Sequence, residues 1–269
     1  MTPDDSGAED TLDLKLPAEA VALFAATPEP SDDTRRHDGP GDDGPAHEKS
    51  PYGPGHGPDR GADRAPGRGP DRGLHDDGRD LLLDRIADWP AADTAAGTFR
   101  LVPVLAARDL ALISRWMNDP AVAEFWELAG EQDVTARHLK DQLDGDGRSV
   151  PCLGVLDGVP MSYWEIYRAD LDPIARHYPA RPHDTGVHLL IGAVADRARG
   201  LGGTLLRAVS DLVLDNRPGC TRVVAEPDLR NTPSVSAFLT AGFRFSQELD
   251  LPGKRAALMI RDRALRNRL

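Results

Sequence analysis

The sequence predicts an α/β protein in which a mixed central sheet is flanked by helices. From Thr98 onward, segments with strand periodicity alternate with segments in which apolar residues recur at helical spacing. The apolar run 187–194 leads through a glycine-rich turn into a helical pattern, which indicates one central crossover unit. Asp157 and Gly158 separate two apolar segments and form the strongest hairpin signal in the chain.

Two segments are expected ahead of the main domain. Residues 11–24 alternate at first and then become helical, so 1–30 is predicted to be an arm that either packs on the main domain or stands alone. Residues 31–79 are rich in glycine, proline and charge, and Leu74 is their single large aliphatic residue. Such a segment cannot bury enough apolar surface to offset an ordering entropy of about 1–2 kcal/mol per residue. We therefore predict a long disordered insert at 31–79.

The main domain is predicted over 80–269. A short helix at 80–89 opens it, and a strand follows at 98–104. The helical pattern at 107–126 is broken at Asp119-Pro120 into two helices, because proline cannot donate the helical hydrogen bond. The remaining elements are a helix at 138–145, two strands within 151–169, a polar, proline-rich loop at 170–185, a strand at 187–194, a helix at 202–215, a strand at 221–228, a helix at 232–243 and two strands within 244–263.

Charge and composition argue against several classes of function. The net charge of −12 disfavours a nucleic-acid partner and an anionic membrane surface. The acidic N-terminus lacks the apolar core of a signal peptide, and no run approaches the about 20 apolar residues of a membrane span. Cys152 and Cys220 have no metal-ligand spacing and are interpreted as reduced thiols. We expect a cytoplasmic protein without a metal site, either a monomer or a homodimer.

The glycines of the turn at 197–204, Arg-Ala-Arg-Gly-Leu-Gly-Gly-Thr, have two possible explanations. Backbone N–H groups at the start of a helix carry partial positive charge and suit a phosphate or pyrophosphate. A tight turn between a strand and a helix also needs glycine for steric reasons alone. The chain has neither the Gly-Lys-Ser/Thr of a P-loop nor a Gly-x-Gly-x-x-Gly near its first strand, which excludes two common phosphate sites.

In two elements the chain resembles the GCN5-related N-acetyltransferase (GNAT) superfamily. The signature Arg/Gln-x-x-Gly-x-Gly/Ala is met by Arg197, Gly200 and Gly202 at the end of a strand. An asparagine that opens the next helix and a Gly-Phe pair that closes it are met by Asn231 and Gly242-Phe243. The resemblance implies the GNAT fold. It also implies an acyl-CoA, such as acetyl-CoA or succinyl-CoA, as co-substrate, with no tightly bound cofactor.

The same resemblance implies which residues bind the coenzyme. The N–H groups of the turn would hold the coenzyme A pyrophosphate, and two arginines of the turn would lie nearby as cations. The implied coenzyme-binding residues are Arg197, Arg199, Gly200, Leu201, Gly202, Gly203, Thr204 and Asn231.

Over 97–265 the chain is further similar to the siderophore branch of that superfamily. The similarity lies in the segments WMNDPAVAEFWE, YWEIYRADLD, GVHLLIG, AEPDLRN and LPGKRAALM. Members of the branch include the hydroxylysine acetyltransferase of aerobactin synthesis, the mycobactin lysine acyltransferase and the desferrioxamine diamine acyltransferase. The resemblance implies acylation of N6-hydroxylysine or N-hydroxycadaverine, which forms a hydroxamate for siderophore biosynthesis.

Asp228 and His188 are the predicted catalytic residues. By the resemblance, Asp228 accepts the proton of the acceptor nitrogen, and His188 holds the hydroxamate-forming end of the substrate. Taken alone, Asp228 would be a turn former or helix cap, and His188 a buried core histidine. Phe238 stands where many members of the superfamily carry a tyrosine that protonates the leaving thiolate, so another group or solvent has to supply that proton.

Two further residues are predicted to bind the substrates. Glu165 belongs to an acidic stretch, with Asp170 and Asp172, that is assigned to the free ammonium of the acceptor; a solvated surface is the alternative. Trp126 is assigned a contact with the acyl chain, and the alternative is that it packs the helices and the wall of the cleft.

Two other functions stay open. An aminoglycoside-type acetyltransferase shares the style of the early helix but would need a wide, strongly acidic cleft. A coenzyme A-binding module without catalytic activity would explain Phe238, whereas His188 and Asp228 together argue for an enzyme.

Overall fold

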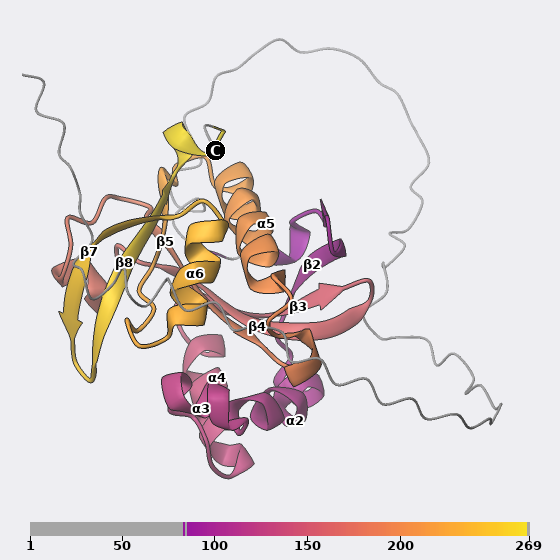
Figure 1. The fold of residues 1–269 in the computed structure, drawn as a ribbon. Coiled ribbons are helices and arrows are strands. Elements are labelled where there is room, and N and C mark those ends of the chain that lie inside the picture. Colours follow the sequence, from indigo (N-terminus) through magenta and orange to yellow (C-terminus); the bar gives the residue numbers. More distant parts are fainter. Residues whose placement is uncertain (1–82, 84, 268–269) are drawn as a thin grey trace, which may run out of the picture. The chain divides into compact units, whose positions relative to one another are not determined.

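The structure, a computed structural model, describes residue 83 and residues 85–267 (Figure 1). The predicted arm at 1–30 and the predicted disordered insert at 31–79 lie outside these residues. The short helix expected at 80–89 is a single 3-10 turn, η1 (Ile86–Asp88). In the described part of the chain, no helix is long and apolar enough to cross a membrane. The cytoplasmic location stays a prediction.

The described residues form one mixed sheet of eight strands in the order β1-β2-β3-β4-β5-β6-β8-β7. All neighbours run antiparallel except β5 and β6, which are parallel. This arrangement confirms the predicted α/β fold with a mixed central sheet. The strands are β1 (Ala92–Thr94), β2 (Gly97–Pro103), β3 (Ser149–Leu156), β4 (Val159–Arg168), β5 (Thr185–Ile191), β6 (Arg222–Ala225), β7 (Arg244–Leu251) and β8 (Lys254–Asp262). The short edge strand β1 was not predicted.

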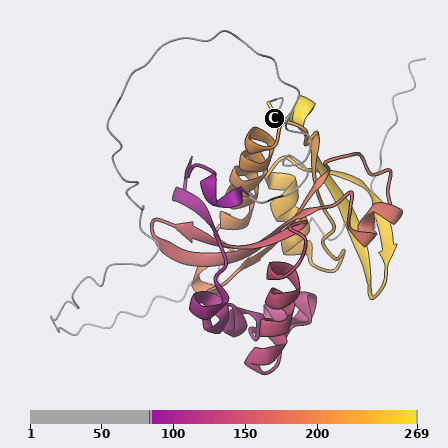
Figure 2. The same cartoon turned by 180° about the vertical axis from the view of Figure 1, so that it is seen from behind.

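Helices cover both faces of the sheet, and each face has its own apolar core (Figures 1 and 2). On β4, successive side chains point to opposite faces, so Trp164 packs with α5 and α6 while Tyr163 packs with the three earlier helices. The helices are α2 (Ala106–Met117), α3 (Pro120–Trp126), α4 (Gln132–Leu143), α5 (Leu201–Asn216) and α6 (Thr232–Thr240).

The helix break predicted at Asp119-Pro120 is confirmed. Asp119 caps α3 by accepting a hydrogen bond from the N–H of Ala121, and Pro120 occupies the first helical position. The prediction for α4 was wrong at its start, since the helix begins at Gln132 and not at 138. Thr135 and Leu139 are its buried residues, and this stripe is too narrow to produce a clear apolar period.

The hairpin predicted at Asp157-Gly158 is also confirmed. Both residues have positive φ, 48° and 82°, which is the backbone of the two-residue turn that matches the twist of a hairpin. The predicted loop at 170–185 holds one 3-10 turn, η2 (Pro173–Arg176).

The parallel strands β5 and β6 pair only at their beginnings and then diverge. Thr185 faces Val223 and Gly186 faces Val224, after which β5 continues to Ile191 while β6 ends at Ala225. The predicted strands at 187–194 and 221–228 were therefore too long at their C-terminal ends. A 3-10 turn, η3 (Val194–Asp196), follows β5. The divergence separates the two strand ends, and the candidate site lies between them.

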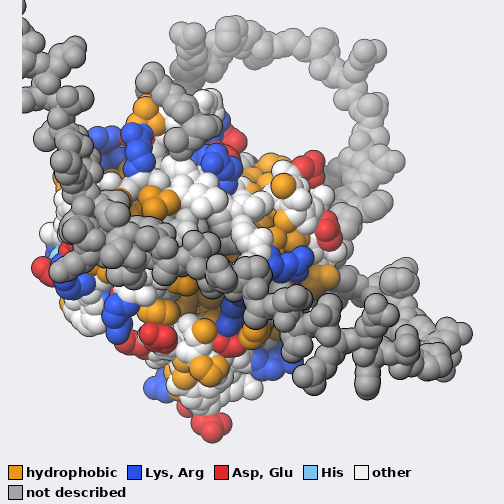
Figure 3. All heavy atoms as spheres, in the orientation of Figure 1, with side chains coloured by type: hydrophobic (Ala, Val, Ile, Leu, Met, Phe, Trp, Pro, Cys, Tyr) orange, Lys and Arg blue, Asp and Glu red, His pale blue; other side chains and the backbone are white. Residues whose placement is uncertain are grey.

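Acidic and basic side chains are interspersed on the face drawn in Figure 3. Among the described residues, ion pairs join charges of opposite sign, for example Arg266 to Asp215 at 2.6 Å and Arg148 to Asp146 at 2.5 Å. The described part of this face shows no single acidic patch.

Candidate active site

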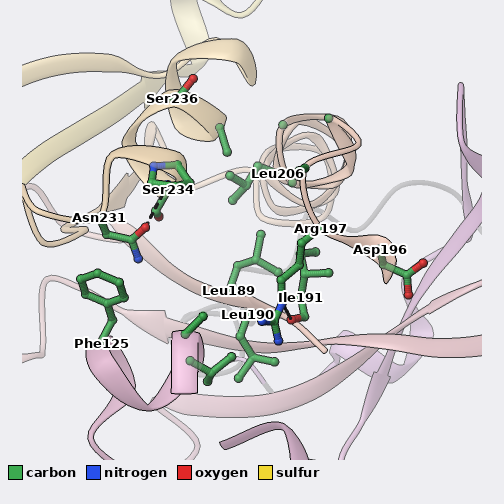
Figure 4. Close-up of a pocket in the computed structure, with 18 of the residues that line it drawn as sticks. Phe125, Leu189, Leu190, Ile191, Asp196, Arg197, Leu206, Asn231, Ser234 and Ser236 are labelled. Carbon is green, nitrogen blue, oxygen red and sulfur yellow. Dashed lines mark hydrogen bonds between the residues drawn. The ribbon is translucent and has the colours of Figure 1, made fainter. Parts of the chain in front are cut away.

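A cavity of about 730 Å³ lies where β5 and β6 diverge. Its walls come from α3, the end of β5, the glycine-rich turn, the start of α5 and one side of α6 (Figure 4). Most of the lining is apolar, with Phe125, Leu189 and Leu206 among the side chains that Figure 4 labels. A chamber of this size, with a mostly apolar lining and a few polar groups, is typical of small-molecule sites in proteins.

The glycine-rich turn offers open backbone donors to this cavity. Gly200 precedes α5 with φ 73°, a conformation that glycine adopts without strain. Within the described residues, the N–H groups of Leu201, Gly202 and Gly203 have no hydrogen-bond acceptor, and the N–H of Thr204 bonds to Gly200 O at 3.3 Å. Three unpaired N–H groups at a helix start form the geometry that an anion needs.

Packing between α5 and α6 explains two of the glycines in another way. A Cβ atom on Gly203 would lie 3.0 Å from Cγ2 of Thr240, and one on Gly202 would lie 3.3 Å from Cβ of Ala237. Steric reasons therefore account for all three glycines, namely the backbone conformation at Gly200 and the helix packing at Gly202 and Gly203, and phosphate binding by the turn stays a prediction.

The two arginines of the turn behave differently. Arg197 donates to Ile191 O at 3.1 Å, to Gly192 O at 2.7 Å and to Oδ1 of Asp119 at 2.7 Å, so its guanidinium ties β5 to the cap of α3. The Arg197 hydrogen bond lowers the pKa of Asp119. Arg199 is largely exposed and lies 3.5 Å from Asp196. Arg199 is the more exposed cation of the turn.

Asn231 caps α6, since its side-chain oxygen accepts the N–H of Ser234 at 3.1 Å (Figure 4). It also lines the large cavity and a second one of about 300 Å³. The two cavities share Phe125, Trp126, Leu189, Asn231 and Ser234 and are therefore adjacent. The smaller one ends at a group of titratable side chains: His138, Glu165, His188, Glu226, Asp228 and Lys254.

Asp228 lies in the smaller cavity, just beyond the end of β6. Its carboxylate accepts the N–H of Arg230 at 2.8 Å and pairs with the Arg230 guanidinium at 2.7 Å. The Arg230 hydrogen bond is the main cause that lowers the pKa of Asp228. Asp228 thus does form a local turn, and it still faces the cavity.

His188 bonds to carboxylates through both ring nitrogens. It is the direct partner of Glu165 in the β4–β5 ladder, and its Nδ1 lies 2.9 Å from Oε2 of that residue. Its Nε2 lies 2.5 Å from Oε1 of Glu226. Burial disfavours the imidazolium, but the charge of Glu226 and the hydrogen bonds to both carboxylates outweigh it and raise the pKa of His188 to about 10.

Glu165 is surrounded by donors. Its Oε1 lies 2.6 Å from Nε2 of His138, 2.7 Å from Nε2 of Gln142 and 3.0 Å from the hydroxyl of Tyr163. Although burial opposes ionisation, the hydrogen bonds to His138 and His188 hold the pKa of Glu165 well below its usual range. The rest of the predicted acidic stretch is elsewhere, because Asp170 pairs with Arg168 and Asp172 caps η2.

Glu226 was missed by the sequence analysis. Besides its bond to His188, it accepts the hydroxyl of Tyr167 at 2.8 Å. Gly186 lies directly opposite Tyr167, and any Cβ there would collide with the phenol ring, so the glycine lets the ring cross β5. The sequence feature that could have identified Glu226 is its Glu-x-Asp spacing to Asp228. No local pattern, however, connects Glu226 to His188.

Two aromatic side chains close the smaller cavity. The ring of Trp126 meets Tyr163 at 5.6 Å and His188 at 6.1 Å, both edge to face, so it lines the junction of the two cavities. Phe238 is buried against Phe243 at 5.0 Å. The nearby phenols, Tyr163 and Tyr167, donate to Glu165 and Glu226 and leave the acid for the thiolate unassigned.

Residues 106–251 match the family described as an acetyltransferase (GNAT) domain. The lysine N-acyltransferase MbtK of Mycobacterium sp. (strain MCS) is 38% identical over 169 residues, which cover 63% of this chain and 69% of that protein. The N(6)-hydroxylysine O-acetyltransferase of Escherichia coli is 38% identical over 155 residues, 58% of this chain and 49% of its own length. The hydroxyornithine transacylase SID3 of Ajellomyces capsulatus is 31% identical, over 56% of this chain and 34% of that protein.

Solved structures share the fold. An uncharacterized protein of Bacillus halodurans superposes with a TM-score of 0.63 and 31% identity, covering 66% of this chain and 92% of that one. The aminoglycoside acetyltransferase AAC(6')-Ib in complex with coenzyme A gives a TM-score of 0.55 at 24% identity, over 64% of this chain and 99% of that one. The second likeness concerns the fold alone.

Proposed function

The chain belongs to the GNAT acetyltransferase family, and on that premise we propose that it transfers the acyl group of an acyl-CoA to the nitrogen of an N-hydroxylated lysine or diamine. The product is a hydroxamate, the iron-binding group of hydroxamate siderophores. The relatives named above act on lysine, hydroxylysine or hydroxyornithine by their names, and this consistency supports the acceptor class.

The donor end of the proposal rests on the open N–H groups of residues 201–203. We assign them to the pyrophosphate of the acyl-CoA, with Arg199 as a nearby exposed cation. The apolar chamber of about 730 Å³ would then hold the pantetheine arm. The thioester would lie at the junction lined by Trp126 and Asn231, next to the smaller cavity.

The choice of an N-hydroxylated acceptor rests on the lowered pKa of the Asp228 carboxylate. A carboxylate whose pKa is lowered by Arg230 is a weak base. A lysine ε-amine with pKa near 10.4 costs about 4–5 kcal/mol to deprotonate at neutral pH. A hydroxylamine nitrogen is already mostly neutral, so a weak base is sufficient for it. Asp228 then has only to take the proton as the C–N bond forms, while the C–S bond breaks and its electron pair leaves with sulfur.

The charge balance of the smaller cavity disfavours an aminoglycoside acceptor. Asp228 is paired with Arg230, and Glu226 lies beside His188 and Lys254. A polycationic sugar would need a wide cleft with an excess of acid, whereas this cavity measures about 300 Å³ and carries both signs. A coenzyme-binding module without activity is tested by the same experiment.

The decisive experiment incubates the purified full chain with each of several donors and acceptors and detects products by mass spectrometry. The donors are acetyl-CoA, succinyl-CoA and a long-chain acyl-CoA. The acceptors are N6-hydroxylysine, N-hydroxycadaverine, lysine, cadaverine and kanamycin. We expect a hydroxamate from at least one hydroxylated acceptor and much slower reaction of the parent amines. Acylation of kanamycin, or no product from any pair, would refute the proposal.

A further inference from the structure

The hydrogen bonds of His188 require both of its ring nitrogens to be donors. A neutral imidazole has one N–H, so it can serve one of the two carboxylates, and its bare nitrogen would face the other. The observed separations are 2.9 Å to Glu165 and 2.5 Å to Glu226. Only the imidazolium satisfies both contacts while both carboxylates are ionised.

The hydrogen-bond donors around Glu165 stabilise its ionised form. Gln142 donates to it from α4, Tyr163 donates from the adjacent position on its own face of β4, and His138 lies one helical turn before Gln142. The side chain of Glu165 is 9% exposed. A carboxylate held by this many donors is a poor site for a proton.

Glu226 is held in a similar way on the other side of the ring. It accepts the Tyr167 hydroxyl, and the Lys254 ammonium lies 3.9 Å from it. The charged and titratable groups around His188 are Glu165, Tyr163 and Tyr167 on β4, His138 on α4, Lys254 on β8, and Glu226 and Asp228 beyond β6. The raised pKa of His188 agrees with this arrangement, in which the two nearest ionised groups are anions.

We propose that His188 works as a permanently charged imidazolium, fixed by Glu165 and Glu226 as positioning residues, and that its single positive charge offsets part of the negative charge of these two carboxylates beside the reacting thioester. This inference rests on the proposed function. Negative charge develops on the carbonyl oxygen and on sulfur during acyl transfer, and two uncompensated carboxylates at the end of the cavity would repel it.

The step is balanced without any proton from His188. The acceptor nitrogen attacks the thioester carbon, and the carbonyl electron pair moves to oxygen. The nitrogen gives its proton to Asp228, the carbonyl re-forms, and the C–S electron pair leaves on sulfur. His188 keeps both N–H protons throughout. It is therefore neither the base of the reaction nor a hydrogen-bond donor to the acceptor.

The protonation state can be measured on the wild-type chain without substrate. In ¹⁵N-histidine-labelled protein, the signals lost in His188→Gln identify His188. We expect both of its nitrogens to remain in the protonated range from pH 6 to about pH 9. A neutral tautomer at pH 7.5 would overturn the inference. It would leave the proposed function standing, because that depends on hydroxamate formation and not on this spectrum.

Kinetics with acetyl-CoA and N6-hydroxylysine then test the role of the charge. His188→Gln leaves two facing carboxylates and should lower kcat about 100-fold at pH 7.5, with KM little changed. The double variant His188→Gln/Glu226→Gln removes one of these two carboxylates, and its kcat should be about tenfold higher than that of His188→Gln. Glu248→Gln, a carboxylate on β7 that pairs with Arg255 away from the site, is the matched control and should behave as wild type. Equal activity of the single and double variants would show that charge compensation is not the role of His188.

Discussion

Glu165 and His188 face each other as direct partners in the antiparallel ladder of β4 and β5, with Oε2 of one 2.9 Å from Nδ1 of the other. The register of this ladder brings Glu165 and His188 together in the smaller cavity. A slip by one residue would turn His188 to the opposite face of the sheet, where Val187 and Leu189 pack against the other core. The same register sets Tyr167 against Gly186, which gives its hydroxyl a path to Glu226.

Asp228→Asn should lower kcat by about 10²–10⁴ if Asp228 accepts the acceptor proton. The asparagine oxygen can still accept the N–H of Arg230, so the local turn and coenzyme binding should persist. Steady-state kinetics measures the loss of kcat, and calorimetric titration with coenzyme A measures whether coenzyme binding persists. Turnover near the wild-type rate would remove Asp228 from the proposed role.

Gly200→Ala should weaken coenzyme A binding and cost about 1 kcal/mol of stability, because the turn has φ 73° at this position. Gly158→Ala is the matched control. Its φ is 82°, and a Cβ at either glycine would meet nothing within 4 Å. We expect similar losses in urea unfolding for the two variants and reduced affinity for Gly200→Ala alone. Unchanged affinity would argue that the turn does not hold the pyrophosphate.

Arg197→Ala should destabilise the protein by about 2 kcal/mol, since it removes charge-assisted bonds to Asp119 and to two carbonyls at the end of β5. Arg199→Ala should cost less than about 1 kcal/mol, because its ion pair is exposed. Arg199→Ala should nevertheless weaken coenzyme A binding in a salt-dependent way. A reversed order of the two stability losses would contradict the contacts described for Arg197.

Stability should fall on both sides of a window between about pH 4.5 and pH 6.5. Although burial opposes it, the charge of His188 holds the pKa of Glu226 at about 2, below its unfolded value, so this contribution is lost as the pH falls through that range. The pKa of His188 is raised to about 10, so its contribution is complete below about pH 6.5 and is lost as the pH rises towards 10.

Urea unfolding at pH 4, 6 and 9 measures this dependence. His188→Gln should be less stable at pH 6 and should show a flatter decline between pH 6 and pH 9. An equal decline in the variant and the wild type would mean that other groups govern the alkaline side.

Local signals determined the elements that the sequence predicted well. Asp157-Gly158 carries its own turn geometry, and Asp119-Pro120 both caps and starts a helix, so neither depends on distant residues. The glycine-rich turn and Asn231 could likewise be placed because their backbone roles lie within one strand-to-helix connection. The sequence by itself thus determined the α/β class and the position of the turn, whereas Asp228 and His188 were chosen through the resemblance to the GNAT superfamily, and their roles stay predictions.

Only the tertiary structure decided what surrounds those residues. Glu226 meets His188 because β5 and β6 are parallel neighbours that diverge, and His138 meets Glu165 because α4 packs against β3, the strand that pairs with β4. These contacts join residues 27 and 38 positions apart. Charge states depend on such contacts, because burial and neighbouring charges shift a pKa and neither is encoded in the local pattern.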